Sequence, residues 1–295
     1  MAPSTSDPAP RAAEPTVAVL LSWFVPGAGH AYVGKLRTGV IAFVVVELVY
    51  LLGLFFSEGR FLEYLPPEMR TRFAGMLSPE VGNLGALLVH ISKYGYGTGT
   101  PSPWPSSMDL GTVLTATSGI LNLFVMSSAH FAARAKAKGL LDAGSMPRPA
   151  TAALMTFLIP GLGQVRQGRV RRGVLAFVML VGMFLLASYL AEGANLDRER
   201  HFYYWSGQFM LGLPAVVVEF FHGHAMLQHE VIYNDAGVVM GTVAGLMNVL
   251  LMLDAYGYSE SKWLAPVAGG KAKPTFTSPN PPPGSEAGSN GGATS

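Results

Sequence analysis

Apolar residues gather in long blocks along the chain, and short polar stretches separate these blocks. Four blocks are each about as long as a helix that crosses a bilayer, roughly 20 residues. They cover residues 39–56, 111–133, 173–191 and 236–256. Since four such blocks in one chain are not expected of a soluble domain, the pattern predicts an all-α integral membrane protein.

The pattern occurs twice. AVLLSWFVPGAGHAYVGKLRTGVIAFV, from residue 18, aligns without a gap with AALMTFLIPGLGQVRQGRVRRGVLAFV, from residue 152, at a constant offset of 134 positions. A weaker match relates residues 109–129 to residues 235–255. We therefore expect a tandem duplication of a unit made of a helix, a Pro-Gly turn and a helix, followed by a later helix.

This duplication sets the expected domain organisation. We predict tails over residues 1–15 and 265–295, membrane repeats over 16–139 and 150–264, and a linker over 140–149. The tails are of low complexity, rich in Pro, Ala, Gly and Ser, and this composition is typical of disorder.

The segment between the first two helices of each copy predicts a turn. Proline removes a backbone donor and ends or kinks a helix, while glycine permits positive φ and close helix approach. The turn residues are Pro26, Gly27, Gly29, His30 and Gly34 in the first copy and Pro160, Gly161, Gly163, Gln164 and Gly168 in the second.

Two other interpretations of this segment fail. Residues 29–36, GHAYVGKL, match GxxxxGK, but Leu36 stands where a phosphate loop needs a hydroxyl for magnesium, and no strand precedes it. We do not expect a cleavable secretory signal, because the same stretch recurs inside the chain, from residue 152, and the first copy then belongs to the mature fold.

Composition narrows the function classes. Only 13% of the residues are charged, and the mean hydropathy is +0.35. A formal net charge of +2 gives no field for nucleic acid, and we expect no nucleic-acid partner. The chain has no cysteine, which excludes disulfides, thiolate nucleophiles and cysteine zinc sites. No cofactor is indicated.

Cations cluster before the second helix of each copy, and such clusters indicate a cytoplasmic loop near anionic headgroups. They are Lys35, Arg37, Arg166, Arg169, Arg171 and Arg172. If the Pro-Gly segments enter and leave on one face, four full helices obey the positive-inside rule. If they cross, residues 82–91 and 207–221 must cross too, giving eight spans. We therefore expect about six to eight membrane segments, with residues 56–80 and 195–200 external in both topologies.

Polar residues within the apolar blocks are candidates for chemistry or packing. They are Glu47, Asn122, Asn248 and Asp254. An intramembrane carboxylate is a functional candidate, but the repeat counterpart of Glu47 is Val181, so we expect Glu47 to be neutral or paired with His90 or His130. The asparagines stand beside Gly119 and Gly245 and are expected to bond closely packed helices.

A histidine-rich stretch, EFFHGHAMLQHE, spans residues 219–230. His222, His224, His229 and Glu230 are the weak candidates for metal ligands. The spacing is not HExxH, and residues two apart do not share a helical face. An interfacial helix end is therefore favoured over a metal site, and no catalytic residues are predicted.

The PGxGHxYxGKxxxG turn, together with Gly245, Asn248 and the Asp254–Tyr256 triplet, resembles a family of uncharacterised bacterial multi-pass membrane proteins. The turn is also distantly similar to the two-transmembrane-helix domain, whose Asp-Arg-Phe triplet is replaced here by residues 30–32 and 164–166. The resemblance implies a bacterial inner membrane but no activity.

Three function classes remain compatible with these features. A non-enzymatic membrane scaffold or assembly factor with membrane-protein partners fits the absence of catalytic signatures. A small-solute or ion transporter fits the internal repeat and the helix breaks. An intramembrane metal-dependent enzyme rests on the histidine-rich stretch alone.

Overall fold

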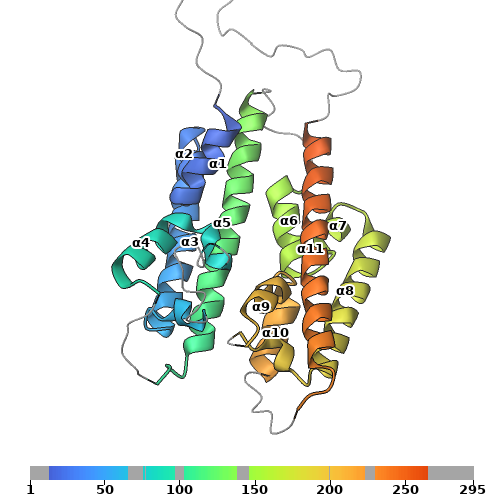
Figure 1. Cartoon of the computed structure of the whole chain (residues 1–295). Helices are drawn as coiled ribbons and strands as arrows, with labels where there is room; N and C mark the ends of the chain where they lie inside the picture. Colours follow the sequence, from blue (N-terminus) through green and yellow to red (C-terminus); the bar gives the residue numbers. More distant parts are fainter. Residues whose placement is uncertain are drawn as a thin grey trace, which may run out of the picture. The chain divides into compact units, whose positions relative to one another are not determined.

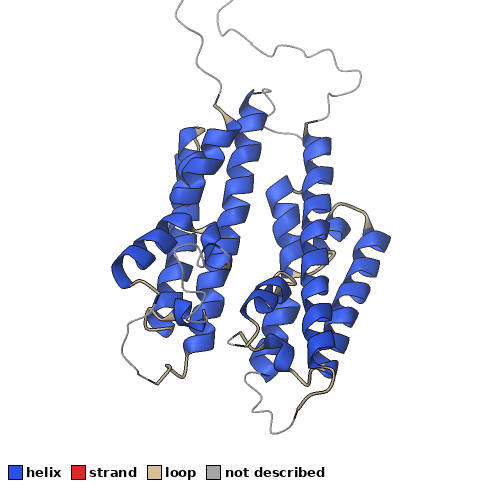
Figure 2. Ribbon diagram, in the orientation of Figure 1, coloured by secondary structure: helices blue, strands red, loops and turns tan. Residues whose placement is uncertain are grey.

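The computed structural model describes residues 13–65, 76, 78–96, 103–137, 146–198, 200–222 and 230–264. These residues form helices, turns and loops, with no strand among them (Figure 2). Most of both predicted tails and most of the linker lie outside the described residues.

The chain passes through eleven α-helices within these ranges (Figure 1). The first five are α1 (Pro15–Phe24), α2 (Ala28–Tyr32), α3 (Leu36–Phe56), α4 (Leu84–Tyr94) and α5 (Met108–Ala137). The others are α6 (Pro149–Leu158), α7 (Leu162–Arg166), α8 (Val170–Leu190), α9 (Phe202–Phe209), α10 (Leu213–His222) and α11 (Asn234–Trp263). Short 3₁₀ helices include η1 (Phe61–Tyr64), η4 (Pro79–Gly82) and η5 (Ala194–Leu196).

Four helices, α3, α5, α8 and α11, are long and apolar enough to cross a membrane. The helices α1 and α6 have 10 residues each, and at 1.5 Å per residue they reach roughly 15 Å, half of a hydrocarbon core. The stretches 82–91 and 207–221, which the eight-span topology requires to cross, lie in short elements instead. Among the described residues, the structure thus provides four full-length spans.

The Pro-Gly segment turns the chain back on itself. α1 ends before Pro26, Gly27 adopts a left-handed φ of 80°, and α2 then runs back beside α1. The backbone N–H of Glu14 donates to the Tyr32 hydroxyl over 3.3 Å, so the end of α2 lies beside the start of α1. The segment is therefore re-entrant: it enters and leaves on the same face, as in the topology with four full helices.

The two halves have matching elements. α1 and α6 have 10 residues each, α2 and α7 have five, α3 and α8 have 21, and α5 and α11 have 30. Gly161 has a φ of 83°, close to that of Gly27. A Cβ at Gly29 would overlap the carbonyl of Ala18, and one at Gly163 would overlap that of Ala152.

The stretches expected as external loops contribute to the protein interior. Phe61, Leu62 and Leu65 are fully buried and pack with Tyr50 of α3 and Leu87 of α4. In the second half, Leu196 of η5 packs against α8 and α10 residues. These stretches fold back because their aromatic and aliphatic side chains bury apolar surface against the helices.

Gly29→Ala and Gly163→Ala should each lower the free energy of unfolding by about 1–3 kcal/mol, because the added methyl group overlaps a helix carbonyl. Thermal unfolding in detergent, followed by tryptophan fluorescence, measures the effect. Gly182→Ala is the control, since a Cβ there meets open space. Equal melting temperatures for all three variants and the parent would contradict the close packing.

Candidate functional site

Two buried asparagines hold the short elements of each half together. The side-chain amide of Asn122 on α5 donates to the carbonyl of Ser22 in α1 over 2.8 Å and to that of Gly82 in η4 over 2.9 Å. Asn248 on α11 donates to Thr156 in α6 over 3.2 Å and to Met210, just after α9, over 3.0 Å. Both asparagines are fully buried, and three of their four hydrogen bonds are buried as well, while the bond to Met210 is partly exposed.

Glu47 has a different partner from those expected. Its Oε1 accepts from the Asn83 amide over 3.1 Å, and the same amide lies 3.2 Å from the Ser118 hydroxyl. His90 instead lies beside Phe61, with the two rings tilted and their centroids 4.7 Å apart. Of the two expectations for Glu47, neutral or paired with His90 or His130, the pairing is not formed, because Asn83 at the end of η4 occupies the partner's place.

An ion pair that the sequence did not indicate crosses between the two halves. Glu80 of η4 and Arg198 are 0% and 2% exposed, and their oxygen and nitrogen lie 3.2 Å apart. The Thr115 hydroxyl donates to Glu80 over 2.8 Å, and the guanidinium lies 4.3 Å from the Trp205 ring centroid. Both charges stand at the ends of stretches that look like external loops, so no periodicity marks them.

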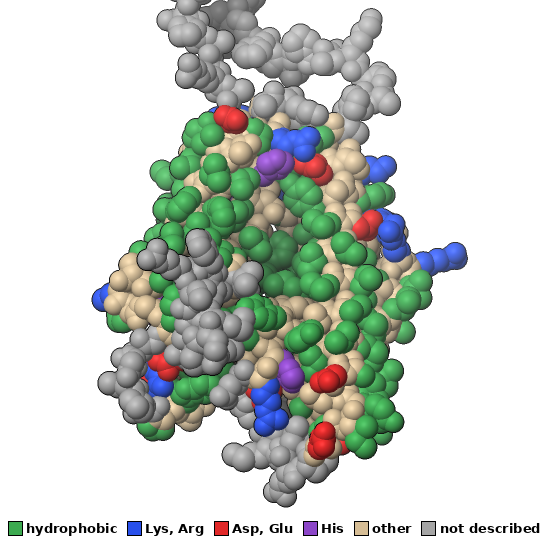
Figure 3. All heavy atoms as spheres, viewed as in Figure 1, with side chains coloured by type: hydrophobic (Ala, Val, Ile, Leu, Met, Phe, Trp, Pro, Cys, Tyr) green, Lys and Arg blue, Asp and Glu red, His purple; other side chains and the backbone are tan. Residues whose placement is uncertain are grey.

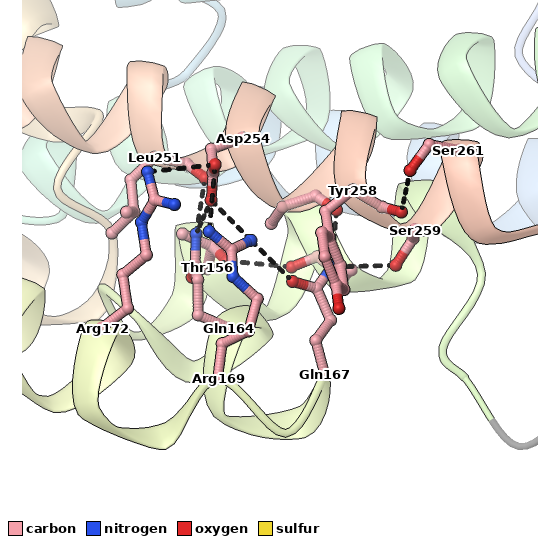
Figure 4. A network of polar contacts seen from close by, with 12 residues as sticks. Thr156, Gln164, Gln167, Arg169, Arg172, Leu251, Asp254, Tyr258, Ser259 and Ser261 are labelled. Carbon is pink, nitrogen blue, oxygen red and sulfur yellow. Dashed lines mark hydrogen bonds and ion pairs between the residues drawn. The ribbon is translucent and has the colours of Figure 1, made fainter.

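The basic turn of the second half forms one polar network with α11 (Figure 4). Asp254 is ion-paired with Arg169 over 2.8 Å and with Arg172 over 3.3 Å. The Gln164 amide donates to Leu251 and to Asp254, over 2.8 and 3.2 Å. The structure therefore brings together three groups that were predicted separately: the turn residue Gln164, the basic residues and the intramembrane acid Asp254.

Gln167, which the sequence pattern does not single out, also bonds to α11, whereas two of the predicted cations of this turn lie exposed. The Gln167 amide donates to the carbonyl of Ala255 over 2.6 Å and to the Ser259 hydroxyl over 2.9 Å. Arg166 and Arg171 are exposed and make no ion pair with a described residue. In the first half Lys35 is half-buried and Arg37 is exposed.

A cavity of about 430 Å³ lies between the halves. Its walls are aliphatic and aromatic side chains of α1, α5, α6 and α11, including Leu123, Phe124, Ala153 and Met252. Figure 3 shows hydrophobic side chains around a recess on the viewed face.

Polar groups lie at one end of this cavity. Ser127, His130 and Tyr256 line it, and the Tyr256 hydroxyl donates to the carbonyl of Ser127 over 3.4 Å. One helical turn further along each helix, Arg134 of α5 and Glu260 of α11 form an ion pair of 2.7 Å. The cavity therefore combines an apolar body with a few polar groups at one end, as ligand pockets commonly do.

The structure describes only part of the histidine-rich stretch. His224 and His229 lie outside the described residues, as does the side chain of His222, the last residue of α10. Glu230 is exposed. Within the described ranges, no three His, Asp or Glu side chains gather as a metal site would require.

The family model of DUF6677, a family of unknown function, matches residues 17–139 and 151–265. The chain belongs to this family. The two matched segments include all four long helices and both Pro-Gly turns. No curated protein and no solved structure shows a significant match.

Asn122→Leu and Asn248→Leu should each lower the free energy of unfolding by roughly 1–3 kcal/mol, because two backbone carbonyls then lack a donor. Chemical unfolding in mixed micelles gives the free energies. Ser92→Ala removes an exposed bond within a single helix and should be nearly silent. Stabilities of both leucine variants equal to that of Ser92→Ala would refute this role for the asparagines.

Proposed function

We propose that this DUF6677 member is a non-enzymatic, multi-pass membrane protein that binds the apolar part of an amphiphile between its two halves. The observation that carries the proposal is the cavity of about 430 Å³, within the range of ligand pockets. In a bilayer the ligands at hand are lipids, so an acyl chain is the expected occupant. Such a protein serves as a lipid-binding scaffold for membrane-protein partners.

Tandem duplication explains how such a cavity arises. The equal helix lengths and the matching left-handed glycines support two copies of one fold. The two-part family match agrees with this division. Two like units placed side by side leave a space between α5 and α11, which apolar side chains such as Phe124 and Met252 line, with Ala153 of α6 on its wall.

Transport and metal-dependent catalysis have weaker support. Glu47 accepts a hydrogen bond from Asn83, as a packing role requires, and its counterpart in the second half is Val181. The histidines that suggested a metal lie outside the described residues or, at His222, have no described side chain, so no observation of the structure favours a metal site there. We therefore assign Glu47 to packing and leave the protein without a catalytic residue.

The proposal places the basic turns on the cytoplasmic side of a bacterial inner membrane. Cysteines at Thr38 and Arg166, both exposed, should resist an impermeant thiol reagent in intact cells and react after lysis. Arg200 is exposed and follows the C-terminal end of α8, whose N-terminal end adjoins the basic turn. A cysteine at this position should therefore react before lysis. The chain has no native cysteine, so the background is zero. The reverse pattern of labelling would overturn the orientation.

Filling the cavity tests the amphiphile directly. Ala153→Phe, on the cavity wall, should reduce the lipid that copurifies with the protein severalfold, as measured by native mass spectrometry, while helical content is kept. Leu250→Phe is the control, because Leu250 is 59% exposed and lies outside the cavity. If a folded Ala153→Phe protein retains as much lipid as Leu250→Phe, the cavity is not the binding site.

A further inference from the structure

The two Pro-Gly turns differ in how their cations are neutralised. In the second half, the Asp254 carboxylate is ion-paired with Arg169 and Arg172. The position of α5 that matches Asp254 in the alignment of the long helices is Ser128. The first half therefore keeps a cation, Lys35, where the second has Arg169, but lacks the acid.

A small cavity of about 40 Å³ lies at this place in the first half. Its polar lining comes from His30, Lys35, Thr38, Ser128 and Arg148, and among the described residues no carboxylate lines it. The volume exceeds the roughly 10–15 Å³ that one water requires. Thr38 and Arg148 are exposed, so the cavity is accessible from outside.

His30 provides a buried donor at this cavity. Its side chain is 3% exposed, and Nε2 lies 3.1 Å from the Ser128 hydroxyl. The other ring nitrogen, Nδ1, is buried with no hydrogen-bond partner. If Nε2 accepts from Ser128, Nδ1 carries the hydrogen and needs an acceptor.

The electrostatics also lack a negative partner. Burial and then the Lys35 charge lower the pKa of His30 to about 4, so its imidazole is neutral at pH 7. Burial and then the Arg148 charge lower the pKa of Lys35. Neither Lys35 nor Arg148 is ion-paired within the described residues, and Glu260 of α11 is already paired with Arg134.

We propose that this cavity is a binding site for a phosphate-type oxyanion, which takes the place that Asp254 fills in the second half. Lys35 and Arg148 supply the charge, His30 Nδ1–H donates one hydrogen bond, and the Thr38 hydroxyl lies at the mouth as a further donor. The phosphodiester of a lipid headgroup and free inorganic phosphate share this chemistry. This site is separate from the apolar cavity and does not depend on the proposed function.

The test transfers the acid between the halves. Ser128→Asp supplies the carboxylate that the second half has, and Lys35→Gln removes a cation. Both variants should weaken phosphate binding by about tenfold or more, because each alters a charge-assisted contact. Arg37→Gln is the control, since Arg37 is exposed and does not line the cavity.

Two arms distinguish the sources of the oxyanion. In detergent, thermal unfolding is followed as inorganic phosphate replaces chloride at constant ionic strength. In nanodiscs, stability in phosphatidylglycerol is compared with stability in phosphatidylcholine. The parent and Arg37→Gln should gain stability saturably in at least one arm, and the other two variants should not. Equal responses of all four proteins in both arms, or no response of the parent, would overturn the site.

Discussion

The structure depends on the hydrogen bonds that two buried asparagine side chains, Asn122 and Asn248, donate to backbone carbonyls. Each half contains short helices that end inside it, and such ends leave backbone carbonyls without partners. In a bilayer an unsatisfied carbonyl is costly, because no water can reach it. Asn122 and Asn248 each donate both amide hydrogens to two such carbonyls, so re-entrant elements are held at defined positions on a long helix.

Close approach makes these bonds possible. Gly119 of α5 contacts η4 so tightly that a Cβ would overlap the carbonyl of Pro79. In the second half, a Cβ at Gly245 of α11 would overlap the carbonyl of Gly207. Glycine one turn before each asparagine lets the backbone of the neighbouring element come within reach of the amide. Small residues and polar bonds together are the usual means by which helices associate within lipid.

Around this common framework the two halves differ in charge. The first contains the buried acid Glu80 and the half-buried acid Glu47, with Arg198 of the second half completing one ion pair. The second neutralises its basic turn with Asp254, while the first has Ser128 at that place. A framework that is secured by amides and glycines tolerates such changes, since its backbone bonds do not depend on them.

The sequence by itself determined the helical membrane class and the breaks at Pro26 and Pro160. These follow from local composition and from backbone chemistry, which neighbours in the chain dictate. It also singled out Asn122 and Asn248, because a polar residue in an apolar block is conspicuous wherever the helix packs.

Only the tertiary structure decided which residues meet. The Glu80–Arg198 pair joins positions 118 residues apart, and nothing local marks either partner. The same holds for Glu47, whose partner Asn83 comes from an element that folds inward. Ion pairs and cavities depend on the distances between elements, and those distances follow from how side chains of distant segments fill the space between helices.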